Sequence, residues 1–62
     1  MQIEEVEKLA ETVFGDRARA SEWLRTSNES LGGCAPLSRL DTEDGRREVA
    51  RILNAIGYGG AA

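Results

Sequence analysis

The chain has 62 residues, enough for one small domain, and at this length we expect a marginally stable monomer or one that a partner stabilises. Its net charge of −3 argues against a dedicated nucleic-acid binder, and its single cysteine, Cys34, excludes an internal disulfide and suits a reducing compartment. No apolar run approaches the roughly 20 residues that span a bilayer and no secretory signal opens the chain, so we expect a soluble, cytoplasmic protein.

The first predicted helix runs from about Ile3 to Phe14. Apolar residues recur on one broad face of this segment at helical spacing, namely Ile3, Val6, Leu9, Ala10 and Val13. Gly15 then supplies a left-handed C-cap at little steric cost, so we expect the helix to end there.

Asp16 predicts the start of a second helix, because an aspartate side chain is a good N-cap. The inward face of this helix would be Ala20, Trp23 and Leu24. We expect Trp23 to anchor the core, so that its replacement by alanine costs about 3–5 kcal/mol. The helix is expected to end near residues 26–28, where short polar side chains compete for the backbone.

The Leu-Gly-Gly sequence at residues 31–33 is the sharpest local signal in the chain. Two glycines after a leucine predict a turn with positive φ or a close approach of two backbones. Pro36 fits the first position of a short third helix, with Leu37 and Leu40 pointing inward.

The last predicted helix begins at Thr42, which is a second good N-cap. Gly45, early in this helix, costs about 1 kcal/mol relative to alanine, and close packing against a neighbouring element would explain it. One face carries the strongest amphipathic stripe, formed by Val49, Ile52, Leu53 and Ile56. The opposite face carries a polar stripe formed by Arg47, Arg51, Asn54 and Tyr58.

These elements predict an all-α fold, a small compact bundle of about four helices with a very short third one. We expect the helical domain to cover residues 1–59 and residues 60–62 to form a flexible tail.

The sequence holds little that could carry a reaction. It has no histidine, and one cysteine cannot build a zinc site, so we expect no catalytic residue, no metal and no cofactor. Arg46, Arg47 and Arg51 form a basic cluster, but acidic residues are interleaved with it on the same helix. Solvated charge is the first interpretation of this cluster, a protein interface the second and a DNA contact a distant third.

The order of caps, glycines and apolar positions, FGD…A…WL…N…LGG…PL…L.T..G…V…L..I.YG, resembles the C-terminal toxin-binding domain of the Xre/MbcA/ParS antitoxin family. The similarity covers nearly the whole chain. It implies a helical, non-enzymatic domain from bacteria that binds a RES-domain toxin. That toxin is an NAD-degrading or ADP-ribosyl-transferring enzyme, and the domain would block access to its active site.

The resemblance also implies roles for individual residues. The family's turn motif corresponds to Leu31, Gly32, Gly33 and Pro36, and its core positions correspond to Phe14, Trp23, Leu24, Val49, Leu53 and Ile56. The toxin-facing region corresponds to the last helix and the end of the domain. We therefore expect the toxin-binding residues to be Arg47, Arg51, Asn54, Tyr58 and Gly59.

Two other functions are compatible with the sequence. One is a small helical adaptor or a homo-oligomer whose last helix binds another protein, and the other is a DNA-binding helical domain. Longer members of the family usually carry an N-terminal helix-turn-helix domain that binds DNA, and this sequence shows no such pattern, so we expect no nucleic-acid binding from this chain alone. The lack of a long apolar run predicts no membrane binding.

Overall fold

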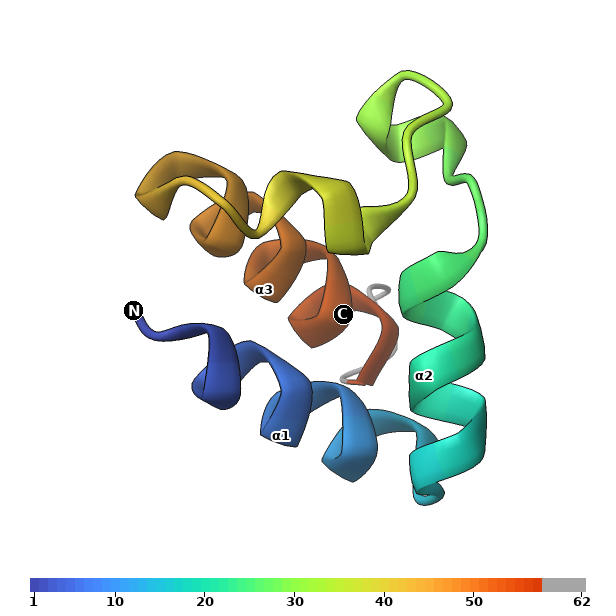
Figure 1. The fold of residues 1–62 in the computed structure, drawn as a ribbon. Coiled ribbons are helices and arrows are strands. Elements are labelled where there is room, and N and C mark those ends of the chain that lie inside the picture. The colour runs from blue at the N-terminus through green and yellow to red at the C-terminus, as the bar shows by residue number, and fades with distance from the viewer. Residues whose placement is uncertain (58–62) are drawn as a thin grey trace.

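The computed structural model describes residues 1–57, and in this part of the chain all regular structure is helical. Figure 1 shows its elements, which are α1 (Ile3–Phe14), α2 (Arg17–Arg25), the 3₁₀ helices η1 (Glu29–Leu31) and η2 (Pro36–Arg39), and α3 (Glu43–Gly57). The all-α prediction is confirmed. The predicted count of four helices is wrong, because the segment that begins at Pro36 is only a short 3₁₀ helix, and η1 was not expected. Runs of three or four residues commonly form i→i+3 bonds instead of α-helical turns.

The three α-helices surround a common core (Figure 1). Helices α1 and α3 lie side by side, α2 crosses the C-terminal end of α1, and η2 lies against α3. The segment between α2 and α3, which contains η1 and η2, leads the chain from the end of α2 back along the core to the start of α3.

The helix ends are formed by the residues that the sequence predicted. Gly15 adopts a left-handed conformation with φ of 69° after α1. The Asp16 side chain accepts a hydrogen bond of 3.0 Å from the backbone N–H of Arg19. The Thr42 hydroxyl accepts one of 3.0 Å from the N–H of Gly45. All three caps are confirmed, since each depends only on residues within one helical turn.

The predicted glycine turn is also confirmed. Gly32 and Gly33 have φ values of 69° and 90°, a region that other residues rarely adopt. The Asn28 side-chain oxygen accepts a hydrogen bond of 2.9 Å from the backbone N–H of Ser30, and the backbone N–H of Asn28 donates one of 3.1 Å to the carbonyl of Cys34. These bonds tie the two ends of the turn together.

The core consists of small and medium-sized aliphatic side chains, namely Val6, Ala10, Ala20, Leu24, Leu31, Leu40, Val49 and Leu53. Pro36 is also fully buried. The predicted inward positions of Leu24, Leu40, Val49 and Leu53 are therefore confirmed, and Leu31 and Pro36 of the predicted turn motif are buried as well.

Trp23, the predicted anchor of the core, is not among its fully buried residues. Trp23 is only partly buried and packs at the edge of the cluster beside Phe14, with ring centroids 5.8 Å apart. The largest fully buried side chains are instead those of Leu53, Val6 and Val49. A side chain that is only partly buried loses less on truncation, so we now expect Trp23→Ala to cost less than 3–5 kcal/mol.

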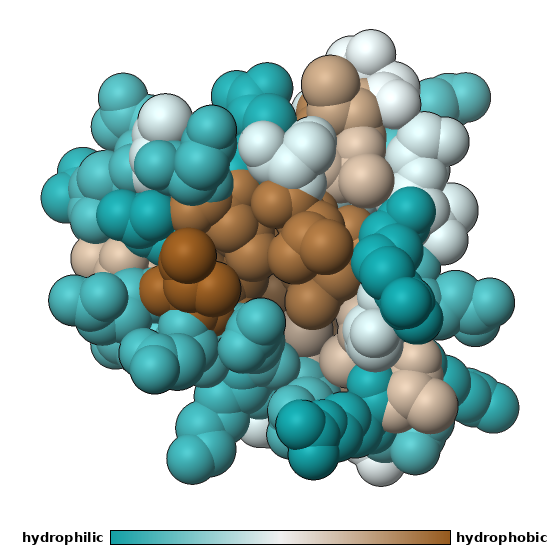
Figure 2. All heavy atoms as spheres, viewed as in Figure 1, coloured by the Kyte–Doolittle hydropathy of each residue, from teal (hydrophilic) through white to brown (hydrophobic). Residues whose placement is uncertain are grey.

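Three further aliphatic residues that the periodicity placed inside are exposed. The exposed fractions are 42% for Ile3 and 45% for both Leu37 and Ile56. Figure 2 shows apolar side chains gathered in the middle of one face, surrounded by hydrophilic residues. Helical periodicity predicts the direction in which a side chain points, but burial requires a neighbouring element at that height, and these positions lack one in the described chain.

Glu43, in the first turn of α3, connects the start of α3 to the start of the chain. Its carboxylate lies 2.6 Å from the amino group of Met1, 3.4 Å from the Arg46 guanidinium and 3.3 Å from that of Arg47. The hydrogen bond from the Met1 amino group, helped by both arginines, holds the pKa of Glu43 below its ordinary value of 4.5, although partial desolvation opposes the shift.

This lowered pKa predicts a component of acid sensitivity. A carboxyl group whose pKa is lower in the folded state stabilises the fold fully above the unfolded value of 4.5, and this contribution is lost as the pH falls through the folded value. Glu43→Gln should therefore melt below wild type at neutral pH, and the gap should narrow as the pH falls below 4.5. Melting curves over this range check the prediction. A gap that stays constant with pH would contradict it.

Candidate functional site

The outer face of α3 brings together three of the predicted toxin-binding residues. Arg47, Arg51 and Asn54 follow one another at i, i+4 and i+7, and all three are exposed. Val49 and Leu53 point to the opposite side and are fully buried. The polar stripe is thus an accessible surface on a helix whose other face is held by the core.

The remaining two predicted toxin-binding residues, Tyr58 and Gly59, lie outside the described residues, as does the predicted tail at 60–62.

The arginine cluster divides into two parts with different surroundings. Arg46 is turned inward, with 19% of its side chain exposed. Its guanidinium donates hydrogen bonds of 2.7 Å to the backbone carbonyls of Met1 and Leu40 and therefore braces the chain start and η2 against α3. Adjacent residues on a helix point about 100° apart, so Arg46 and Arg47 cannot share one face. This geometry removes Arg46 from the surface available to a partner.

Arg47 and Arg51 differ in how their charges are compensated. The guanidinium of Arg47 lies 3.3 Å from the Glu43 carboxylate, but its side chain is 70% exposed, so this pair is weak. Within residues 1–57 no carboxylate forms an ion pair with Arg51. Arg51 therefore presents the more available positive charge on this face.

A groove lies beside the polar stripe, between the last turns of α3 and η1. Its volume is about 650 Å³, and it is lined by Asn28, Ser30, Arg51, Ile52, Ala55 and Ile56. Arg51 thus belongs to both the outer face of α3 and the groove.

The groove explains why the prediction of Ile56 as a core residue is wrong. Ile56 continues the apolar stripe of Val49 and Ile52, but it lies about three turns beyond Gly45, where Arg39 at the end of η2 approaches this side of α3. Within the described chain, the last turns on this side are left open. Sequence reasoning missed the groove because Asn28 and the following residues have the composition of an ordinary turn.

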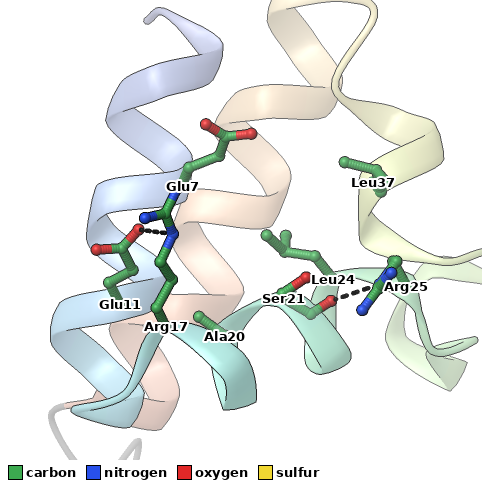
Figure 3. A pocket seen from close by; sticks show the side chains of 8 residues that line it. All are labelled: Glu7, Glu11, Arg17, Ala20, Ser21, Leu24, Arg25 and Leu37. Carbon is green, nitrogen blue, oxygen red and sulfur yellow. Dashed lines mark hydrogen bonds and ion pairs between the residues drawn. The ribbon is translucent and has the colours of Figure 1, made fainter.

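A second, smaller pocket opens between α1, α2 and η2 (Figure 3). Its volume is about 240 Å³, and it is lined by Glu7, Glu11, Arg17, Ala20, Ser21, Leu24, Arg25 and Leu37. Arg17 lies 3.9 Å from the Glu11 carboxylate across its rim, and Arg25 donates a hydrogen bond of 3.4 Å to the Ser21 carbonyl. The lining contains neither imidazole nor thiol, and we find no nucleophile paired with a base in it.

The described residues form neither a metal site nor a membrane-spanning helix. In residues 1–57 no group of three or more His, Cys, Asp or Glu side chains could hold a metal ion. In the same residues no helix is long and apolar enough to cross a membrane.

Comparison with known proteins identifies a family whose domain matches a range that includes α3 and its exposed surface. The sequence model of the antitoxin Xre/MbcA/ParS C-terminal toxin-binding domain matches residues 9–59. This range contains α2, both 3₁₀ helices and α3 with its exposed face and groove. The chain belongs to this family. The resemblance that its caps, glycines and apolar positions indicated is thereby confirmed.

Two curated relatives agree with the family match. The chain is 38% identical over 53 residues to an Antitoxin Xre from Pseudomonas putida, covering 82% of this chain and 33% of that protein. It is 36% identical over 45 residues to an Antitoxin Xre from Photorhabdus laumondii, covering 73% of this chain and 30% of that protein. This antitoxin-type domain thus spans about a third of the length of the curated relatives it matches. No solved structure gives a significant match.

Proposed function

We propose that this chain is the toxin-binding part of an antitoxin, that its partner is a RES-domain toxin, and that it inhibits the toxin by occluding the active site. The family match over residues 9–59 carries the proposal, because that family is defined as a toxin-binding domain. Steric occlusion needs no catalytic residue in the inhibitor, so we assign no enzymatic activity to the chain. We place its action in the cytoplasm, since a single cysteine suits a reducing compartment.

The proposed binding surface is the outer face of α3, formed by Arg47, Arg51 and Asn54, with Tyr58 and Gly59 added from the sequence. The three described side chains are exposed, so they are accessible to a partner without any change in the core. Arginine and tyrosine are enriched among the residues that dominate protein–protein binding energies.

The test is NAD consumption by a RES-domain toxin while increasing amounts of the chain are added. We expect stoichiometric inhibition and co-elution of the two proteins on a sizing column. If the chain is folded by circular dichroism, and the toxin nevertheless keeps full activity and forms no complex with it, the proposal is contradicted. A small helical adaptor that binds another protein would then be the leading interpretation of the chain. A complex with DNA whose affinity falls steeply with salt would instead favour the DNA-binding alternative.

The double variant Arg51→Ala, Asn54→Ala should bind the toxin at least about 30-fold more weakly, as expected when side chains central to an interface are truncated. Its melting temperature should stay within a few degrees of wild type, because both side chains are exposed. Arg19→Ala, at an exposed position of α2, is the matched control and should bind as wild type does. Calorimetric titration measures all three affinities. Wild-type affinity in the double variant would exclude this stripe from the interface.

A further inference from the structure

The groove between α3 and η1 presents an apolar surface that the core does not use. Ile52, Ala55 and Ile56 come from two successive turns of α3 at i, i+3 and i+4, so they lie next to one another along one side of the helix. Ile56 is 45% exposed, whereas Ile52 is partly buried against the core. An aliphatic surface left open beside a polar rim is typical of a binding site.

The wall opposite α3 is held in place before any partner arrives. The backbone carbonyl of Asn28 accepts hydrogen bonds of 3.0 Å from the N–H of Leu31 and 2.9 Å from that of Gly33. The Asn28 side chain also caps η1 through the N–H of Ser30. These bonds fix the wall, so a ligand in the groove need not order it, which lowers the entropic cost of binding.

The charge of the groove selects the chemistry of its occupant. Among the described residues that line the groove, Arg51 is the single charged one, although the chain as a whole has a net charge of −3. The groove is therefore a locally positive site on an acidic domain. A guanidinium group binds a carboxylate or a phosphate through two parallel hydrogen bonds, and the carboxylate is the one of these two groups that unmodified protein side chains supply.

We propose that the groove receives a segment of the toxin that presents an aliphatic or aromatic side chain to Ile52 and Ile56 and a carboxylate to Arg51. The inference rests on the proposed function, because it takes the toxin as the occupant. Arg51 belongs to both the groove and the proposed binding face of α3, so the two surfaces are continuous. A second copy of the chain is a poorer occupant, since two copies of net charge −3 repel each other. Ile56 is then a specificity-determining residue.

The experiment compares Ile56→Asp with Leu37→Asp by calorimetric titration against the toxin. The two positions are matched, because each is a large aliphatic side chain that is 45% exposed, but Leu37 lies on η2, outside this groove. We expect Ile56→Asp to weaken binding at least about 30-fold and Leu37→Asp to stay within about threefold of wild type. Both variants should keep the wild-type circular dichroism spectrum, since neither side chain is in the core.

A charge-reversal experiment tests the second half of the inference. Arg51→Glu should also lose at least about 30-fold in affinity, while Arg51→Lys keeps the charge, loses the two-bond geometry and should fall between Arg51→Glu and wild type. An Arg51→Glu chain that binds as tightly as wild type would overturn the carboxylate assignment.

The outcomes separate this inference from the proposed function. A wild-type chain that does not bind the toxin refutes both. A wild-type chain that binds, with Ile56→Asp as tight as Leu37→Asp, overturns the groove and leaves the proposed function standing. Sedimentation velocity of the chain alone tests the other occupant. A dimer that Ile56→Asp abolishes and Leu37→Asp preserves would assign the groove to a second copy and also overturn the inference.

Discussion

Replacing Leu53 by alanine is expected to remove a large part of the free energy of unfolding of the domain. Leu53 is fully buried and belongs to the core cluster with Val6 and Val49. Truncating a buried leucine to alanine costs about 2–5 kcal/mol, because the transfer free energy of the removed atoms is lost and a cavity remains. A chain of 62 residues has a total stability of roughly 3–9 kcal/mol at typical values per residue. The substitution therefore removes a large part of the stability.

Leu37→Ala is the matched control for this prediction, since the same atoms are removed from a side chain that is 45% exposed. We expect it to cost less than about 1 kcal/mol. Urea unfolding followed by circular dichroism measures both variants. Similar losses at the two positions would mean that Leu53 is not at the centre of the core.

Replacing Gly45 by alanine is the second change with a large expected effect. A Cβ atom at this position would lie 1.8 Å from the backbone carbonyl oxygen of Arg39, at the end of η2. Helix propensity alone predicts a gain of about 1 kcal/mol for glycine to alanine. The clash is with backbone, so η2 has to move away from α3. We expect a net destabilisation of at least about 3 kcal/mol, the upper end of overpacking costs.

Gly57→Ala provides the control in the same helix. There the new Cβ would lie 2.9 Å from the Cγ2 of Val13, which is a side-chain atom and can move more easily than backbone. We expect this variant to lose less stability than Gly45→Ala. Urea midpoints of the two variants and wild type provide the comparison. A Gly45→Ala chain more stable than wild type would show that propensity outweighs the contact with Arg39.

The boundaries of the elements were predictable because their causes are local. The predicted first helix coincides with α1, Ile3–Phe14, and its end is set by Gly15. Asp16 and Thr42 begin the next two α-helices through hydrogen bonds to backbone groups three residues away. The length of η2 was less predictable, because a segment of four residues has little periodicity to read.

The close packing at Gly45 was predicted only in part. A glycine in the first turns of a helix indicates that something lies close to it, but the sequence does not name that neighbour. The structure identifies it as the carbonyl of Arg39. Similarly, the basic cluster was visible in the sequence, whereas the inward turn of Arg46 toward Met1 and Leu40 depends on how three segments meet.

The sequence by itself determined the helical class, the caps, the glycine turn and the polar stripe of Arg47, Arg51 and Asn54, because each follows from residues within a few positions of one another. Only the tertiary structure decided which apolar positions are buried. Ile56 and Leu53 lie on the same predicted stripe, yet one is 45% exposed and the other fully buried. The difference comes from the packing of segments that are distant in sequence: Arg39 at the end of η2 approaches this side of α3 at Gly45, whereas Ile56 lines the open groove further along, so the candidate groove exists only once the chain has packed.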